Sequence, residues 1–206
     1  FGAGNTCKMK RAIHNSIALT LVMGVVLTIV GLLFNDPILK AIGVPSEVFS
    51  EASTYLSIYF WSLIFVMVYN MGSGILRSVG DSKRPLYFLI FSSVVNIILD
   101  FLFVKYFHFG VAGAGYATLI AQAISAIMVM YVLMKTEDDY KVILKEIGFD
   151  KEILLKIIKI GLPTGFQQSI VSLSNVIVQS YINVYGASVI AGYSVTIKID
   201  GFVNLP

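Results

Sequence analysis

Six apolar stretches, each about as long as a bilayer is thick, constrain this sequence more than any other feature. A helix of about 20 apolar residues spans a hydrocarbon core. The stretches cover residues 13–34, 55–76, 86–107, 111–134, 160–185 and 187 onward. Of the 206 residues, 57% are hydrophobic and 13% are charged, whereas a soluble domain carries about 25% charged residues. The sequence therefore predicts an all-α integral membrane protein built as a polytopic helical bundle.

The basic residues lie between these stretches and predict how the chain crosses the membrane. Of the 15 Lys and Arg residues, 12 fall in segments 1–12, 77–85 and 135–159. The loops on the other side hold only Lys40 and Lys105. Loops rich in Lys and Arg stay in the cytoplasm. We therefore expect the turn from Arg77 to Pro85 and the segment 136–159 to be cytoplasmic.

Segment 136–159 is expected to separate two bundles. From residue 141 to 159 it alternates charged and apolar residues at helical spacing, and Lys151, Lys156 and Lys159 flank a strongly apolar face. This pattern predicts an amphipathic helix that lies on the inner membrane face. The division predicted is a first bundle over 1–135, the linker over 136–159 and a second bundle over 160–206.

Asp100 is the clearest polar residue within a predicted span. Asn96 is four residues earlier, so the two side chains share one face of a helix. Thr118 lies on the next span at about the same depth, roughly 10 Å from the outer turn. A carboxylate, an amide and a hydroxyl at one level can take a proton or bind a hard cation such as Na⁺. The alternative is that Asp100 pairs with Lys105, although five residues is a poor helical spacing.

A second polar pattern runs along the fifth stretch. Its members fall on one helical stripe: Gln168, Ser172, Asn175, Gln179 and Asn183. Such a stripe lines either a cavity that admits a solute or a polar seam between helices. We assign it no catalytic role.

Several function classes find no support in the sequence. It has no hydrolase nucleophile elbow, phosphate loop or His-rich metal spacing, so no enzyme activity is predicted. The basic residues flank membrane segments, so no nucleic-acid partner is expected. No repeated filter-like sequence favours a channel. His14 follows Lys10 and Arg11, and an ordinary interfacial histidine explains it better than a proton relay.

Taken together, the short motifs resemble the multidrug and toxic compound extrusion (MATE) family of the MOP superfamily. They occur in the family's order across nearly the whole chain. They are Gly2-Ala-Gly-Asn5 with Lys10-Arg-Ala-Ile-His14; Gly74-Ile-Leu-Arg77 with Gly80-Asp-Ser-Lys83 and Pro85; Asn96-Ile-Ile-Leu-Asp100; Gly110-Val-Ala-Gly113 with Ala117-Thr118; and Gly161-Leu-Pro163.

The resemblance implies a fold and a function. Family members have twelve helices in two lobes and export drugs and organic cations across the cell (plasma or inner) membrane in exchange for H⁺ or Na⁺. By this resemblance the chain is partial, with helices three to seven plus part of the eighth, and we expect no transport from it alone. The lipid bilayer and small organic substrates are the implied partners, with H⁺ or Na⁺ as coupling ion and no other cofactor.

The resemblance also implies a cation site. Asn96, Asp100 and Thr118 match three of the family's N-lobe cation residues, and the fourth, an Asp of the first helix, would precede Phe1. One branch of the family carries a Glu in the seventh helix, but residues 161–185 hold no carboxylate, which disfavours coupling of that type.

Two rival functions remain at this point. A lipid-linked oligosaccharide or polysaccharide exporter of the same superfamily would favour a cavity rich in Arg and Lys, and the predicted spans contain few cations. A membrane receptor that transports nothing would respond to a ligand without ion flux.

Overall fold

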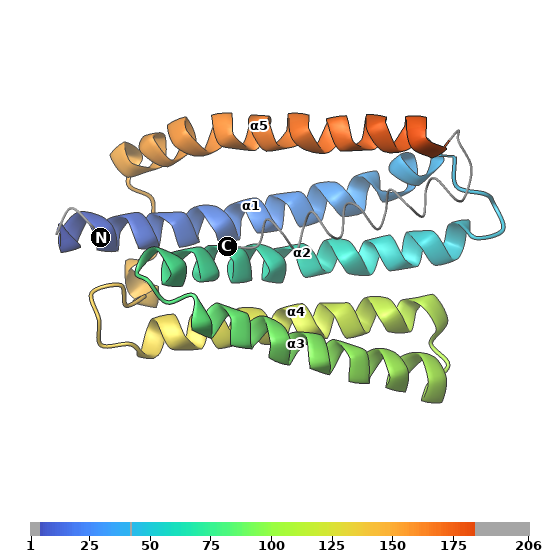
Figure 1. Ribbon diagram of the computed structural model, residues 1–206, viewed down its shortest axis with the longest axis horizontal. Helices are drawn as coiled ribbons and strands as arrows, with labels where there is room; N and C mark the ends of the chain where they lie inside the picture. Colours follow the sequence, from blue (N-terminus) through green and yellow to red (C-terminus); the bar gives the residue numbers. More distant parts are fainter. Residues whose placement is uncertain (1–4, 42, 184–206) are drawn as a thin grey trace. The chain divides into compact units, whose positions relative to one another are not determined.

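The computed structural model describes residues 5–41 and 43–183, and these residues are almost wholly helical (Figure 1). The helices are α1 (Thr6–Ala41), α2 (Phe49–Ser78), α3 (Lys83–Phe101), a π-helix (Leu102–Tyr106), α4 (Gly110–Lys135), a 3₁₀ turn (Leu144–Glu146) and α5 (Lys151–Asn183). Four of the segments are long and apolar enough to cross a membrane, namely α1, α2, α3 with its π-helix, and α4. The predicted all-α membrane fold is thus confirmed.

The last two predicted spans are not among the four candidate spans found in the described residues. Residues 160–183 are helical as expected, but they belong to a longer helix that begins at Lys151. This helix, α5, is not among the four candidate spans. Its Gln, Asn and Ser residues lower the hydropathy of the stretch. The span predicted from residue 187 onward lies outside the described residues.

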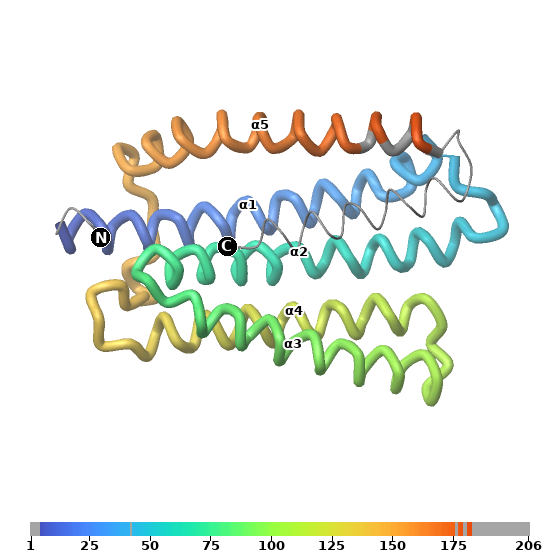
Figure 2. The backbone as a smooth tube through the Cα atoms, in the orientation of Figure 1, coloured from blue at the N-terminus to red at the C-terminus, as the bar shows by residue number. Residues whose placement is uncertain are grey.

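The chain forms two compact units, residues 1–154 and 155–206. In the first unit, α2 packs against α1 and α4, and α3 packs against α4 (Figures 1 and 2). The start of α1, the α2–α3 turn and the end of α4 lie at one end, which we call the basic end. The other end holds the α1–α2 and α3–α4 connections. The predicted lobe boundaries at 135 and 159 stay a prediction.

The core of the first unit lies toward the basic end. Leu76 of α2 and Val129 and Leu133 of α4 are completely buried there. Tyr140 and Val142, which follow α4, are buried in the same cluster. Most other apolar side chains on α1 to α4 are exposed, as expected for helices that face lipid rather than water.

Small residues let the helices approach closely. A Cβ atom added to Gly72 of α2 would lie 2.8 Å from a methyl carbon of Val129 on α4. A Cβ atom on Gly115 of α4 would lie 3.2 Å from Ile58 of α2. Close backbone approach through small residues is the main packing device of membrane helices. Gly115, one of the small residues that follow Gly110, therefore packs against α2.

The amphipathic helix predicted over 141–159 is wrong in its first half. Residues 141–150 contain one 3₁₀ turn and otherwise no regular helix, and the α-helix begins only at Lys151. The apolar side chains of Tyr140 and Val142 are buried in the core of the bundle instead of facing a membrane. The backbone N–H of Val142 donates to the carbonyl of Leu133, which turns the chain back along α4. We call residues 136–150 the connector.

The turn from Arg77 to Pro85 is held by local contacts. Gly80 has a φ of +93°, a conformation that glycine adopts without strain. Asp81 accepts a hydrogen bond from the backbone N–H of Arg84 at 3.1 Å and pairs with its side chain at 3.2 Å. The hydroxyl of Tyr69 donates to the carbonyl of Pro85 at 2.8 Å. These contacts start α3 at a fixed position, which also fixes where its polar residues fall.

Candidate functional site

Asp100 lies in the last turn of α3, four residues after Asn96 on the same face. Both side chains are partly buried. The Oδ1 atom of Asp100 and the Nδ2 atom of Asn96 are closed to solvent, and neither has a hydrogen-bond partner. An unpaired polar atom in an apolar surrounding costs about 1–3 kcal/mol. The carboxylate oxygen of Asp100 favours a proton or a cation, whereas the amide N–H of Asn96 favours a hydrogen-bond acceptor.

A π-helix from Leu102 to Tyr106 follows Phe101 and ends this span. Its hydrogen bonds run between residues five apart, so each turn is wider than an α-helical turn. The wider turn changes the direction of the side chains that follow. The Nζ atom of Lys105 lies over the ring of Phe101, 4.6 Å from its centroid. Lys105 is thus directed to an aromatic ring, and the alternative pairing of Lys105 with Asp100 is not formed.

Thr118 stands on α4, the helix that packs against α3. It is partly buried, and its hydroxyl donates to the carbonyl of Ala114 at 3.0 Å. The lone pairs of its oxygen remain available as acceptors. No hydrogen bond joins Thr118 to Asn96 or Asp100 in the described part of the chain. The fold therefore brings the three residues onto two packed helices without a hydrogen bond between the helices at this point.

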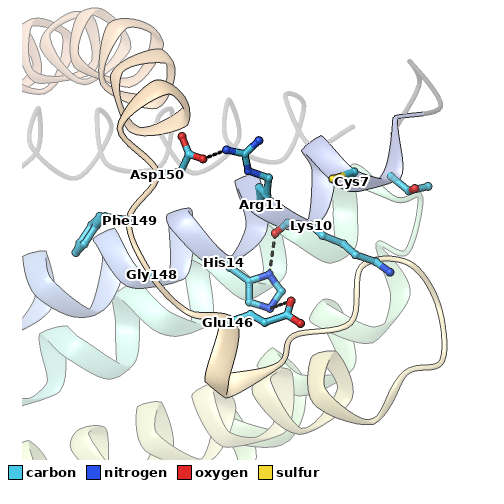
Figure 3. A pocket seen from close by; sticks show the side chains of 9 residues that line it. Cys7, Lys10, Arg11, His14, Glu146, Gly148, Phe149 and Asp150 are labelled. Carbon is cyan, nitrogen blue, oxygen red and sulfur yellow. Dashed lines mark hydrogen bonds and ion pairs between the residues drawn. The ribbon is translucent and has the colours of Figure 1, made fainter.

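A second polar group lies at the basic end, where the connector crosses α1. His14 is 3% exposed, and its Nδ1 donates to the carbonyl of Lys10 at 2.7 Å. Its Nε2 accepts the backbone N–H of Ile143 at 2.9 Å. One nitrogen donates and the other accepts, which is the pattern of a neutral imidazole. Glu146 Oε2 lies 3.9 Å from the same Nε2 (Figure 3).

Asn15 and Arg11 add two further links between α1 and the connector. The completely buried amide of Asn15 donates from Nδ2 to the carbonyl of Asp150 at 2.8 Å. The guanidinium of Arg11 pairs with the carboxylate of Asp150 (Figure 3). We call the contacts of Arg11, His14 and Asn15 with the connector the α1 clasp. An open cavity of about 590 Å³ lies beside it.

Asp150 also caps α5. Its Oδ1 accepts the backbone N–H groups of Glu152 at 3.0 Å and Ile153 at 3.2 Å. The hydrogen bond from Ile153, together with the Arg11 guanidinium and the Glu152 amide, holds the pKa of Asp150 below its ordinary value. Aspartate is a favoured N-cap residue, because its carboxylate accepts hydrogen bonds from the first backbone N–H groups of the helix. The capping explains why the predicted linker helix begins at 151.

Comparison with known proteins shows which family this chain belongs to. The MatE family model matches residues 1–102. The probable multidrug resistance protein YoeA of Bacillus subtilis is 32% identical over 213 residues, which cover 100% of this chain and 46% of that protein. A MOP superfamily transporter from Pyrococcus furiosus has a TM-score of 0.80 at 29% identity, over 93% of this chain and 43% of that one. This chain belongs to the MATE family.

Other MATE relatives agree. The multidrug export protein MepA of Staphylococcus aureus is 28% identical over 204 residues, or 99% of this chain and 45% of that protein. An outward-facing multidrug resistance MATE transporter has a TM-score of 0.80 at 28% identity, over 90% of this chain and 42% of that structure. The chain thus spans less than half the length of these relatives. The MATE resemblance stated from the motifs is confirmed.

The amide stripe of this MATE chain lies on α5. Gln168, Ser172 and Asn175 are exposed on that helix, at the spacing that places them on one face. The side chains of Gln179 and Asn183 lie outside the described part of the structure. Whether the stripe lines a cavity or a seam stays a prediction.

Sequence reasoning missed the α1 clasp and the buried polar face of α1. Asn15 donates to a residue 135 positions away, which no local pattern announces. A signal for the buried face was present. Small or polar residues recur on α1 at spacings of three and four, and the structure buries all of them: Gly24, Thr28, Gly31 and Asn35.

Proposed function

We propose that this MATE chain is part of a multidrug exporter that moves small organic cations across the cell membrane in exchange for H⁺ or Na⁺. The unpaired, solvent-inaccessible carboxylate oxygen of Asp100 on α3 carries the proposal. Ionisable groups within a membrane are costly and mark ion or proton pathways. The names of the relatives support multidrug export as the direction of the proposal.

In the proposed mechanism, Asp100 accepts H⁺ or, with Asn96 and Thr118, binds Na⁺. The ion supplies the missing partner of the carboxylate oxygen. Because α3 and α4 pack against each other, a change at Asp100 is passed to the neighbouring helix. Ion binding changes the access state of the protein only if the two states bind the ion with different affinity. The same difference then drives the release of the drug outside.

The distribution of charge supports the proposed orientation. The described Lys and Arg residues of the first unit gather at the basic end, apart from Lys40 and Lys105. We place the basic end in the cytoplasm because cytoplasmic loops are rich in these residues.

The test uses the full-length protein in proteoliposomes with an imposed H⁺ or Na⁺ gradient. We expect Asp100→Asn to abolish the part of drug efflux that depends on the gradient. Thr118→Val should reduce it if Na⁺ is the coupling ion and leave it nearly unchanged if H⁺ is. Glu47→Gln, which removes an exposed carboxylate from the α1–α2 connection, is the matched control. Gradient-driven efflux by Asp100→Asn equal to that of the parent protein would refute the proposed role.

A further inference from the structure

An open hollow of about 500 Å³ lies between α2 and α4, away from Asp100. Its wall combines two aromatic rings, Trp61 and Tyr116, with the hydroxyl groups of Ser53, Thr54 and Ser57. Ligand sites of roughly 300–1,000 Å³ lined by aromatic side chains and a few polar groups hold drug-sized molecules. The hollow lies wholly within the first compact unit.

The position of Trp61 argues against an interfacial anchor. Tryptophan anchors sit at the two ends of a membrane span. Trp61 instead lies near the middle of α2, about 18 Å along the helix from Phe49. Its side chain is 56% exposed and that of Tyr116 is 47% exposed, so both rings present surface to the hollow. Aromatic ring faces attract cations, most strongly when water is excluded.

The polar wall is built around a buried asparagine. Asn35 of α1 donates from Nδ2 to the Oγ atoms of Ser57 at 2.7 Å and Ser53 at 3.1 Å. Ser53 donates in turn to the carboxylate of Asp36 at 2.9 Å. The hydroxyl groups are thereby fixed in place, and Asp36 adds a negative charge behind them.

The surrounding charge is also suited to a cation. A smaller hollow of about 230 Å³ adjoins the first through Thr54 and is lined by Glu51 and His108. No Lys or Arg lines either hollow within the residues that the structure describes. The carboxylate of Asp36 is bonded to the lining hydroxyl of Ser53, and Glu51 lines the adjoining hollow. Two carboxylates therefore adjoin the polar wall without a competing basic side chain in it.

We propose that the hollow at Trp61 and Tyr116 is a binding subsite for an aromatic organic cation. Its ring faces hold the apolar and charged parts of the ligand, and the fixed hydroxyl groups with the nearby carboxylates select for positive charge. This inference rests on the proposed export function and supplies a site for the exported molecule. The subsite lies between α2 and α4, whereas Asp100 and Asn96 stand on α3; Thr118, the third residue of the proposed ion site, is on α4 two residues after Tyr116.

The test measures saturable binding of radiolabelled tetraphenylphosphonium to the full-length protein in detergent. Trp61→Leu and Tyr116→Leu each remove a ring and should weaken binding roughly 2- to 30-fold. Trp61→Phe keeps a ring and should stay within about 3-fold of the parent protein. Tyr131→Leu is the matched control, because Tyr131 is another exposed tyrosine of α4 and lies outside the hollow. Tetraphenylborate, an anion of the same shape, should not compete.

Three results would overturn the inference. They are equal affinities of Tyr116→Leu and Tyr131→Leu, full competition by tetraphenylborate, and no saturable binding by the folded parent protein. Tryptophan fluorescence adds an independent readout in a full-length background whose other tryptophans are replaced by Phe, because Trp61 is the single tryptophan of this sequence. The ligand should change the emission of that background, and Trp61→Phe within it should abolish the signal.

Export measured in the same preparations separates the two proposals. Gradient-driven export of tetraphenylphosphonium with an unchanged half-saturating concentration in both leucine variants refutes the subsite and leaves the export function standing. Weakened binding in these variants, together with unchanged gradient-driven export by Asp100→Asn, supports the subsite and refutes the coupling role of Asp100.

Discussion

Replacing His14 tests whether the α1 clasp holds the connector in place. His14→Ala removes the acceptor for the backbone N–H of Ile143, which Nε2 accepts at 2.9 Å. Ile143 is 40% exposed, so the loss is that of an ordinary hydrogen bond, about 0.5–1.5 kcal/mol. Each 1.4 kcal/mol changes an equilibrium tenfold, so the opening equilibrium at Ile143 should shift roughly 2- to 13-fold.

Hydrogen exchange read by mass spectrometry measures this shift directly, because local opening sets the exchange rate of a protected amide. Peptides covering 140–150 should exchange faster by about that factor in His14→Ala, while peptides from α2 should not change. His14→Gln should recover much of the protection, since the amide oxygen of Gln can replace Nε2 as the acceptor. His108→Ala is the control, because His108 is the other histidine and is exposed at the opposite end.

Equal exchange rates of the connector in His14→Ala and His108→Ala would show that His14 does not hold the connector in place. The prediction also fails if His14→Gln is as poorly protected as His14→Ala while both are folded. In that case the buried ring, and not its hydrogen bond, would hold the connector.

Three further predictions follow from the packing, the helix cap and the charge pattern. Gly72→Ala should lower the unfolding midpoint in detergent by an amount equivalent to about 1–3 kcal/mol, because the new Cβ would meet a valine of α4 at 2.8 Å. The neighbouring Gly74→Ala, which meets no atom within 4 Å, should raise it slightly. The pKa of Asp150 is lower in the folded protein than its ordinary value of 3.8, so the ionised carboxylate stabilises the start of α5 at pH values above 3.8. This stabilisation should be lost as the pH falls below 3.8 and the carboxylate takes up a proton. In Asp150→Asn the cap remains without the charge, so exchange at 151–154 should lose its acid dependence; an unaltered acid profile would contradict the assignment. In a full-length background whose other cysteines are replaced by Ser, Cys7, which is exposed, should react with an impermeant maleimide only from the cytoplasmic side. Cys7→Ser combined with Ser46→Cys should react only from outside, and labelling of both from one side would reject the proposed orientation.

Much of the local structure could be predicted because it depends on neighbours in sequence. The four spans of the first unit follow from apolar length and flanking charge, and the helices are found where these two signals place them. The common face of Asn96 and Asp100 follows from helical spacing alone. The tight packing at Gly115 follows from the run of small residues after Gly110.

Side-chain partners could not be predicted in the same way. Lys105 is five residues from Asp100, and its direction depends on a π-helix that no sequence pattern indicated. The connector was predicted to be helical because its apolar and charged residues alternate. The buried positions of Tyr140 and Val142 and the cap at Asp150 end that pattern. The free energy gained by burying these side chains in a tertiary core is larger than the small free energy of local helix propensity.

The sequence alone determined that this chain is a helical membrane protein of the MATE family, where its first four apolar spans lie, and which carboxylate falls within one of them. Those features depend on hydrophobic length, charge and residue order, which are properties of the chain itself. Only the tertiary structure decided that the Oδ1 atom of Asp100 lacks a partner, that His14 and Asn15 hold a segment about 130 residues away, and that Trp61 and Tyr116 share one hollow. These contacts join helices that are distant in sequence, so they are set by how the helices pack and not by any local pattern.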